Sequence, residues 1–266
     1  MSKVILITGA SSGIGQITAG FLAEKGFKVY GTSRNPKKAD HDFTLLRLDL
    51  QDVSSIEDAI GKIIETEGRI DVLINNAGMG ITGPIEETPT EEMKRAFDTN
   101  FFGAIEVMKC VIPHMRKQNE GLIINVTSIA GYMGLPFRGI YSAAKGALEI
   151  LTETLSMELK QFNIKVTNIA PGDIATDIAS GRFHTPVFKG SPYAGIYKNN
   201  LDLMDEHVDK GKDPILMARQ IYHIINDPNP KLHYKVGEFM QKFSVVLKRI
   251  LPDRLYEKLI MNHYGM

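Results

Sequence analysis

The chain has 266 residues, and its 31 Lys and Arg are balanced by 31 Asp and Glu. This length favours one large α/β domain, and the zero net charge argues against nucleic acid or an anionic membrane as partner. The single cysteine, Cys110, excludes an internal disulfide and fits a reducing compartment. The apolar run before Thr8, Val4 to Ile7, is too short for a signal-peptide core. No apolar run reaches the roughly 18 residues that cross a bilayer. We therefore expect a soluble, cytoplasmic protein.

Short apolar runs alternate along the chain with longer segments of helical periodicity. Several runs are apolar throughout, as in VILI and LIINV, which is typical of a parallel sheet with helices on both faces. The expected strands are Val4–Ile7, Phe27–Tyr30, Thr44–Leu48, Asp71–Ile74, Leu122–Val126, Lys165–Ile169 and Leu232–Val236. The β-α-β-α order predicts a doubly wound open sheet that binds ligands at the carboxyl ends of its strands.

Three of the intervening segments carry helix signals. The apolar residues at helical spacing are Ile14, Ile17 and Phe21 after Gly13, and Ile56, Ile60 and Ile63 in the next segment. Asp52 is placed to cap the second helix. Thr88-Pro89-Thr90-Glu91 combines a capping-box spacing with proline at the first helical position. It predicts a third helix that runs to about Met115.

The stretch TGASSGIG, residues 8–15, directly follows the first expected strand. Glycines there allow a tight turn and a close approach of the backbone to a pyrophosphate, while the next helix offers free N–H groups and a positive dipole end. The spacing Gly9-x-x-x-Gly13-x-Gly15 differs from the G-x-G-x-x-G fingerprint. A plain strand–helix turn is therefore the alternative interpretation of this stretch.

Further motifs follow in a fixed order: Asp49, NNAG at 75–78, Asn100, Ser128, YSAAK at 141–145 and PGDIAT at 171–176. With the glycine turn, they resemble the classical short-chain dehydrogenase/reductase family. The C-terminal segment is similar to the branch that contains 17β-hydroxysteroid dehydrogenases and related bacterial reductases. The resemblance implies one Rossmann-fold domain over residues 1–266, with a central parallel sheet of about seven strands flanked by helices. It also implies a substrate lid at 177–213 and a C-terminal helical extension at 237–266.

The catalytic chemistry can be argued from three of these residues. Tyr141 and Lys145 are four apart and share a helix face, and an ammonium close to a phenol is expected to lower the phenol pKa. Ser128 lies on the turn after LIINVT and can bind the oxygen that Tyr141 protonates. The resemblance implies hydride transfer to a carbonyl, with Tyr141 as proton donor and Ser128 polarising the oxygen. It also implies that Lys145 holds the nicotinamide ribose and that Asn100 binds a water linking Lys145 to solvent.

The second expected strand leads into Ser33 and Arg34 without the acidic residue that an NAD site usually carries there. Ser33 can hydrogen-bond a 2′-phosphate and Arg34 can pair with it, so we expect NADP(H) rather than NAD(H); a solvated surface arginine is the alternative. The cofactor contacts implied by the resemblance are Gly9, Ser11, Ser12, Gly13, Ile14, Gly15, Ser33, Arg34, Asp49, Leu50, Asn76, Ala77, Gly78, Tyr141, Lys145, Pro171, Gly172, Ile174 and Thr176.

A metal site is not expected. Cys110 and His114 share a helix face, but no other Cys or His cluster accompanies them, so a packed or surface pair explains them better than metal binding.

The substrate pocket is expected between Met79 and Ile81, the segment 129–136 and the segment 177–214. The last segment carries aromatic and apolar side chains between glycines, which suits a lid over a lipophilic ketone, whether steroid-like, retinoid-like or acyl. These side chains are Phe183, Val187, Phe188, Tyr193 and Tyr197. A 3-oxoacyl thioester reductase and a non-catalytic NADP-binding regulator are the alternatives. An epimerase of the extended relatives is disfavoured, because its TGxxGxxG pattern is missing.

The tail from Phe239 onward carries apolar residues at helical spacing beside basic ones. The apolar set is Phe239, Phe243, Val246, Leu247 and Ile250, and the basic set is Lys242, Lys248 and Arg249. The default prediction is a face buried against the body or a partner subunit, with an interfacial membrane helix as the alternative. Besides a small carbonyl or alcohol substrate, we therefore expect a homodimer or homotetramer, with neither nucleic acid nor a membrane as partner.

Overall fold

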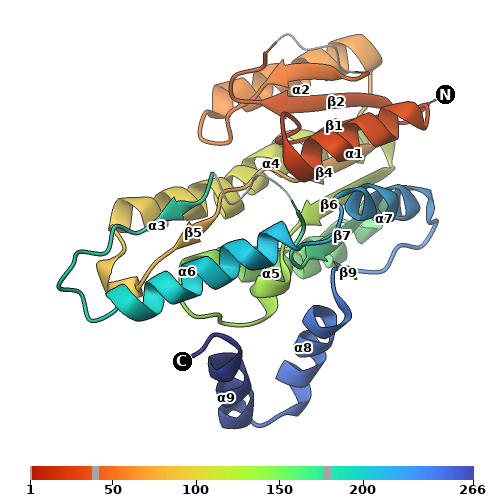
Figure 1. Ribbon diagram of the computed structural model, residues 1–266. Helices are drawn as coiled ribbons and strands as arrows, with labels where there is room; N and C mark the ends of the chain where they lie inside the picture. The colour runs from red at the N-terminus through yellow and green to blue at the C-terminus, as the bar shows by residue number, and fades with distance from the viewer. Residues whose placement is uncertain (1, 38–41, 176–180) are drawn as a thin grey trace.

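Seven parallel strands form the centre of the molecule (Figure 1). The computed structural model describes residues 2–37, 42–175 and 181–266. The strand order is β3-β2-β1-β4-β6-β7-β9, which is that of a doubly wound Rossmann fold, as predicted. The strands are β1 (Val4–Ile7), β2 (Lys28–Ser33), β3 (Thr44–Arg47), β4 (Val72–Asn75), β6 (Gly121–Val126), β7 (Ile164–Pro171) and β9 (His233–Val236).

All seven predicted strands are confirmed, with small shifts at their ends. The largest shifts are in β2, which continues to Ser33, and in β7, which continues to Pro171. Both extensions carry the chain toward the carboxyl edge, where the site residues lie. A second sheet of two short parallel strands, β5 (Ile81–Thr82) and β8 (Phe183–His184), was not predicted. Two-residue strands are too short to show a sequence period.

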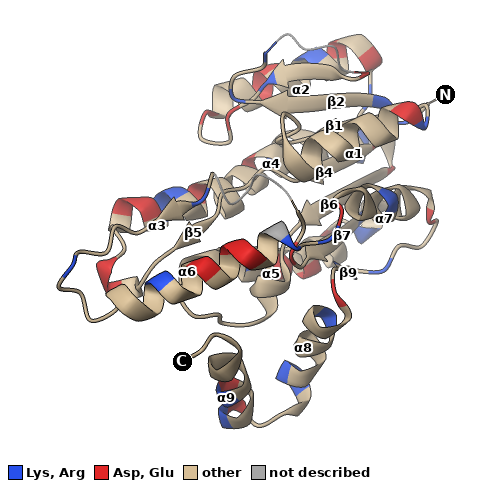
Figure 2. Cartoon of the chain, in the orientation of Figure 1, with Lys and Arg blue, Asp and Glu red and all other residues tan. Residues whose placement is uncertain are grey.

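Helices cover both faces of the sheet. The helices are α1 (Gly13–Glu24), α2 (Val53–Glu67), α3 (Thr90–Phe97), α4 (Gly103–Gln118), α5 (Gly139–Glu158), α6 (Ala194–Asp209), α7 (Ile215–Asn226), α8 (Phe239–Ile250) and α9 (Asp253–His263). Side chains alternate across each strand, so Leu6 packs with α2, α4 and α5 while Ile5 packs with α1 and α7. The inner strands β1, β4 and β6 carry no charged residue, and charges gather on the helices and loops (Figure 2).

The predicted helix starts are partly confirmed. The Asp52 side chain accepts the Ser55 N–H and caps α2 as expected. At the third helix the predicted capping box is wrong: Pro89 is the N-cap residue, and the Thr88 hydroxyl donates to the Pro84 carbonyl at 2.7 Å instead. This helix then passes through a π-helical turn into α4 and ends slightly beyond the predicted Met115.

In α1 the residues that face the sheet are not those with the strongest apolar pattern. Ile14, Ile17 and Phe21 are only half-buried. The residues buried by α1 are Gly15, Thr18, Ala19 and Leu22. Three of these four side chains are small, which lets the backbone of α1 approach the sheet closely. The close approach of the backbone, and not the size of the side chains, therefore determines which face of α1 is turned to the sheet.

The C-terminal segment forms a hairpin of α8 and α9 beside the body (Figure 1). Val245 and Tyr256 pack on Ile129 and Met133 in a small separate core. Burial of this apolar stripe against the body is wrong for most of its members, because Phe239 is 70% and Ile250 66% exposed. Its burial against a partner subunit stays a prediction. Within the described residues, every helix is too short or too polar to pass through a bilayer.

Candidate active site

The glycine turn lies between β1 and α1 and has little space for side chains. Gly9 and Gly13 have φ angles of 68° and 54°, a left-handed conformation that glycine adopts without strain. A Cβ on Gly15 would lie 2.1 Å from the Gly9 carbonyl oxygen and 2.5 Å from Asn76 Nδ2. Asn76 donates to the carbonyls of Thr8 and Gly9 at 2.9 and 3.1 Å. The turn is therefore held in shape by β4 as well as by its own glycines.

The start of α1 fits a dinucleotide pyrophosphate. Ser12 is the N-cap residue, but its side chain makes no capping hydrogen bond, and the first turn holds no acidic residue. The side chains of Ser11 and Ser12 are exposed. An uncapped helix N-terminus behind a glycine cradle offers N–H donors and a positive dipole end to an anion.

The expected adenosine contacts lie at the ends of β2 and β3. A backbone hydrogen bond of 2.8 Å from Ala10 links the glycine turn to β2. Ser33 is half-buried and Arg34 exposed, so both can approach a ligand at this edge. Leu50 is packed in the core at 9% exposure, whereas Asp49 is only partly buried. Of that pair, Asp49 has the more accessible side chain.

The three expected catalytic side chains come together after β6. Ser128 Oγ accepts the Ala130 N–H at 3.1 Å and is hydrogen-bonded to the Tyr141 hydroxyl. Lys145 lies one turn further along α5, is 5% exposed and donates to the Val126 carbonyl at 3.0 Å. The sequence placed these residues correctly at the carboxyl edge of the sheet.

The predicted direction of the Tyr141 pKa differs from the structure. Burial raises the pKa of Tyr141, and the hydrogen bond from Ser128 and the nearby Arg138 and Arg182 oppose that rise. Burial also lowers the pKa of Lys145 to about 8, against the attraction of Glu149. Desolvation therefore outweighs the simple charge effect expected from the Tyr-x-x-x-Lys spacing, because both groups lie away from water.

Asn100 is fixed by the backbone of a neighbouring loop. It sits in the π-helical turn Asp98–Phe102 and is 1% exposed. Its Oδ1 accepts the Met79 N–H at 3.0 Å, and its Nδ2 donates to the Met79 carbonyl at 2.9 Å. A Cβ built on Gly78 would lie 2.7 Å from Asn100 Oδ1 and 3.3 Å from Lys145 Nζ. Asn100 thus lies beside Lys145, and its binding of a water stays a prediction.

A buried carboxylate beneath Lys145 was not anticipated. Glu149 is 5% exposed and accepts hydrogen bonds from Thr127 and Asn168. His233 Nδ1 lies 3.3 Å from Glu149, and burial raises the pKa of this carboxyl. Glu149 follows Lys145 by four residues, so helical spacing would have placed the two on one face. Its network reaches β6, β7 and β9 and ties the lysine-bearing helix to the sheet.

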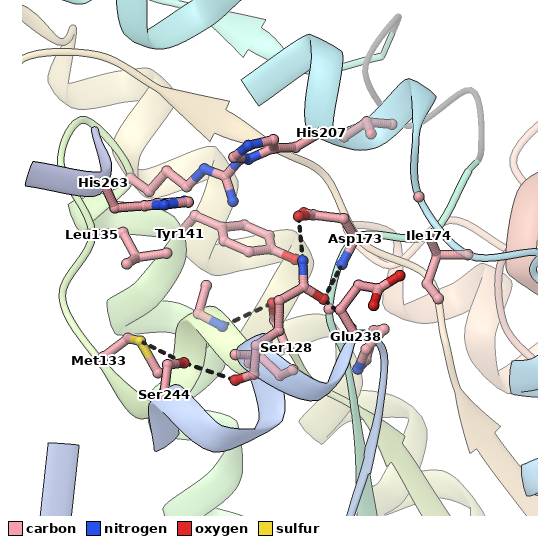
Figure 3. A pocket seen from close by; sticks show the side chains of 18 of the residues that line it. Ser128, Met133, Leu135, Tyr141, Asp173, Ile174, His207, Glu238, Ser244 and His263 are labelled. Carbon is pink, nitrogen blue, oxygen red and sulfur yellow. Dashed lines mark hydrogen bonds between the residues drawn. The ribbon is translucent and has the colours of Figure 1, made fainter. Parts of the chain in front are cut away.

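A cavity of about 690 Å³ opens beside Tyr141 (Figure 3). Figure 3 shows His207 and His263 on one side of Tyr141 and Ser128 on the other. The walls are mostly apolar and include Ile81, Met133, Leu135, Val208, Leu259 and Ile260. Pro171 at the end of β7, and Gly172 and Ile174 after it, also line it. Thr176 lies outside the described residues.

The aromatic side chains expected over the pocket are used elsewhere. Tyr197 is buried, donates to the Thr82 carbonyl at 2.9 Å and packs on Phe137 at 5.1 Å between ring centroids. Phe188 is 64% exposed. In their place the hairpin of α8 and α9 supplies much of the wall, including Gln241. Its Oε1 accepts the Asp173 N–H at 3.2 Å, a contact that no sequence pattern indicated.

Comparison with known proteins decides the family. Residues 3–186 match the family model described as short chain dehydrogenase. The chain belongs to the short-chain dehydrogenase family. It is therefore an oxidoreductase of the class that acts on CH–OH groups, which confirms the resemblance seen in the motifs.

Relatives within the short-chain dehydrogenase family match almost the whole chain. A 3-ketodihydrosphingosine reductase of Bacteroides thetaiotaomicron is 39% identical, with 99% of this chain and 98% of the relative covered. A short-chain dehydrogenase of Streptomyces avermitilis has a TM-score of 0.85 at 26% identity, covering 100% of this chain and 97% of its own. ElxO, solved with NADP bound, has a TM-score of 0.72 at 29% identity, with 89% of this chain and 97% of its own covered.

Proposed function

We propose that this protein is an NADP(H)-dependent reductase of lipophilic ketones. The observation that carries the proposal is the hydrogen-bonded pair of Ser128 and Tyr141 facing a large, mostly apolar cavity at the carboxyl edge of the sheet. A proton donor and a hydroxyl partner in an apolar cavity suit a carbonyl oxygen that must be polarised and protonated.

The reaction we propose adds a hydride and a proton across a carbonyl. The hydride, with its two electrons, would come from a reduced nicotinamide held at this edge of the sheet and would add to the carbonyl carbon. Tyr141 gives the phenolic proton to the oxygen, which becomes the alcohol hydroxyl. Ser128 donates a hydrogen bond to the same oxygen and orients it. Lys145, largely protonated at neutral pH since its pKa is about 8, would hold the nicotinamide ribose and favour the phenolate left behind on Tyr141.

The proposed cofactor site extends from the glycine turn to the end of β2. The open N-terminus of α1 would bind the pyrophosphate, and Ser33 with exposed Arg34 would bind a 2′-phosphate. The residues directly after β2, Arg34 to Lys37, include no carboxylate that would repel that phosphate. The binding of NADP by ElxO, a relative of the same fold, supports this preference.

The proposed substrate class rests on the cavity. Its apolar walls suit a hydrocarbon ligand, and the Bacteroides relative is named 3-ketodihydrosphingosine reductase. We propose that the described part of segment 177–213 is a lid, because His207 and Val208 of α6 line the cavity. The extension 237–266 would form the opposite wall.

The test is NADPH consumption by the full-length protein against a panel of ketones. The panel contains 3-ketodihydrosphingosine, a ketosteroid, retinal, a 3-oxoacyl thioester and a small water-soluble ketone, each with NADPH and with NADH. We expect the highest kcat/KM for a lipophilic ketone with NADPH. If the 3-oxoacyl thioester gives the highest turnover, the proposed class of lipophilic ketones is wrong and the protein is a thioester reductase. Tight NADPH binding without turnover of any carbonyl would favour the non-catalytic regulator.

A further inference from the structure

Exposed apolar side chains concentrate in the C-terminal hairpin. Most of the large apolar side chains that the described residues leave exposed fall between residues 239 and 266, and the rest are scattered over the remainder. Those in the hairpin are Phe239, Met240, Phe243, Val246, Ile250, Leu255, Leu259, Met261 and Met266. Such a cluster marks an interaction surface more often than a freely solvated one.

Four of these residues form one continuous line along α8, here called the α8 stripe: Phe239, Phe243, Val246 and Ile250. Their spacing puts them on one helix face, and they are 70%, 37%, 48% and 66% exposed. The rings of Phe239 and Phe243 stack with centroids 5.7 Å apart. Val245, on the other side of the helix, is only 2% exposed. The helix therefore turns its most apolar face away from the protein.

The charges of α8 are all positive. Its sequence FMQKFSVVLKRI contains two lysines and an arginine and no acidic residue, and Figure 2 shows this run of basic residues on the helix. Lys242 and Arg249 are exposed, lie seven residues apart and therefore share one edge of the α8 stripe. Among the described residues, neither is in an ion pair with a carboxylate; Lys248, by contrast, pairs with Asp253 at 2.9 Å.

An anionic lipid surface fits this combination better than a second copy of the chain. In a twofold contact the same patch of both copies meets, so two stripes packed together would bring the basic edges that carry Lys242 and Arg249 from both copies to one interface, without any acidic residue of α8 to pair with. A bilayer interface accepts the apolar side chains into its acyl boundary, and anionic headgroups neutralise cations at the rim of an amphipathic helix.

The apolar surface also continues into the cavity. Met240 and Leu259 are 65% and 45% exposed, and both line the cavity beside Tyr141. We propose that the α8–α9 hairpin docks on an anionic phospholipid surface, with the α8 stripe inserted at the acyl boundary and Lys242 and Arg249 at the headgroups. In this arrangement the apolar rim of the cavity meets the membrane. The docking does not depend on the proposed activity.

The experiment is cosedimentation of the full-length protein with vesicles. We compare vesicles of phosphatidylcholine alone with an equimolar mixture of phosphatidylcholine and phosphatidylglycerol. The protein should bind the mixed vesicles and much less the neutral ones. Raising NaCl from about 0.1 M to about 1 M shortens the screening length from about 10 Å to about 3 Å and should weaken the binding. Absence of binding to the mixed vesicles at low salt would overturn the proposal.

Two double variants separate the apolar and the ionic parts. Phe239→Glu with Ile250→Glu should weaken vesicle binding by at least about 30-fold, because two large apolar side chains no longer leave water. Lys242→Glu with Arg249→Glu should weaken binding to the mixed vesicles by at least about tenfold and leave no preference for them. None of the four is among the described residues that line the cavity, so NADPH turnover of a small soluble ketone is expected to persist.

A matched control carries the same charge change on other elements. Val53→Glu with Leu216→Glu replaces two exposed apolar residues in the first turns of α2 and α7, where a carboxylate is favourable. This variant should bind vesicles like the unmodified protein. Unchanged binding of the stripe variant would refute the docking. A second result would also refute it: the unmodified protein is a dimer that binds no vesicles, and Phe239→Glu with Ile250→Glu converts it to a monomer. That result would assign the stripe to a second copy. Neither result bears on the reductase activity.

Discussion

Replacing Gly15 with alanine tests the shape of the glycine turn directly. The added Cβ would lie 2.1 Å from the Gly9 carbonyl oxygen and 2.9 Å from its carbon, and backbone atoms cannot rotate aside as a flexible side chain can. Overpacking of this kind costs about 1–3 kcal/mol, and we expect the upper end because backbone must move. For a chain of this size, about 2–3 kcal/mol corresponds to a fall in Tm of roughly 4–12 °C. NADPH affinity should fall as well, since the displaced segment is the proposed pyrophosphate cradle.

Gly20→Ala in the same helix is the matched control. Nothing lies within 4 Å of a Cβ built there, so the substitution should stabilise α1 by about 0.5–1 kcal/mol. Thermal unfolding followed by circular dichroism and NADPH titration by fluorescence would be measured on both variants. If Gly15→Ala melts and binds NADPH like the unmodified protein, the turn tolerates displacement and the proposed cradle is wrong.

Three other predictions address the catalytic and cofactor residues. Tyr141→Phe keeps the ring but removes the transferable proton, so kcat should fall at least about a hundredfold with NADPH affinity retained; near-normal turnover would remove Tyr141 from the mechanism. Because the pKa of Lys145 is about 8 in the folded protein and 10.5 in an ordinary lysine, the unfolded chain binds more protons between these values. Lys145 should therefore make the free energy of unfolding increase as the pH rises through this range. Lys145→Met should lose this contribution in urea unfolding at about pH 7.5 and about pH 9.5, and an identical rise in both proteins would contradict the lowered pKa. Ser33→Asp with Arg34→Ala should reverse a preference for NADPH of roughly a hundredfold in kcat/KM; equal use of both cofactors by the unmodified protein would show that Arg34 faces solvent.

The sheet was predictable because its inner strands are buried on both faces. Such strands read as unbroken apolar runs, as in Val4–Ile7, which the structure reproduces without a shift. Their ends were less certain, since the residues that extend β2 to Ser33 and β7 to Pro171 are small, polar or proline and end the run of large apolar side chains. The short pair β5 and β8 joins segments about a hundred residues apart, a long-range contact that local periodicity does not encode.

The catalytic trio was predictable because local rules suffice to place it. Helical spacing aligns Tyr141 with Lys145, and the end of an apolar run locates Ser128. Its electrostatics were not predictable, because the direction of a pKa shift depends on how much water surrounds each group. Burial raises the pKa of Tyr141 and lowers that of Lys145, and burial is set by the whole fold rather than by the distance between two residues in sequence.

The orientation of α8 could not be predicted from its sequence. An amphipathic pattern shows that a helix has an apolar face, but not that the protein is what covers it. Here the attached side makes both kinds of contact: Val245 packs in the small core with Ile129, while Gln241 accepts the N–H of Asp173 and its amide donates to the Asp173 carboxylate. These bonds anchor the helix to the loop after β7 and leave Phe239 and Ile250 outward. Hydrogen bonds to a fixed loop are directional and apolar burial is not, so the bonds to Asp173, together with the packing of Val245, determine how the helix is rotated. The apolar face must then find another nonaqueous environment, which is the physical reason to look for a lipid surface there.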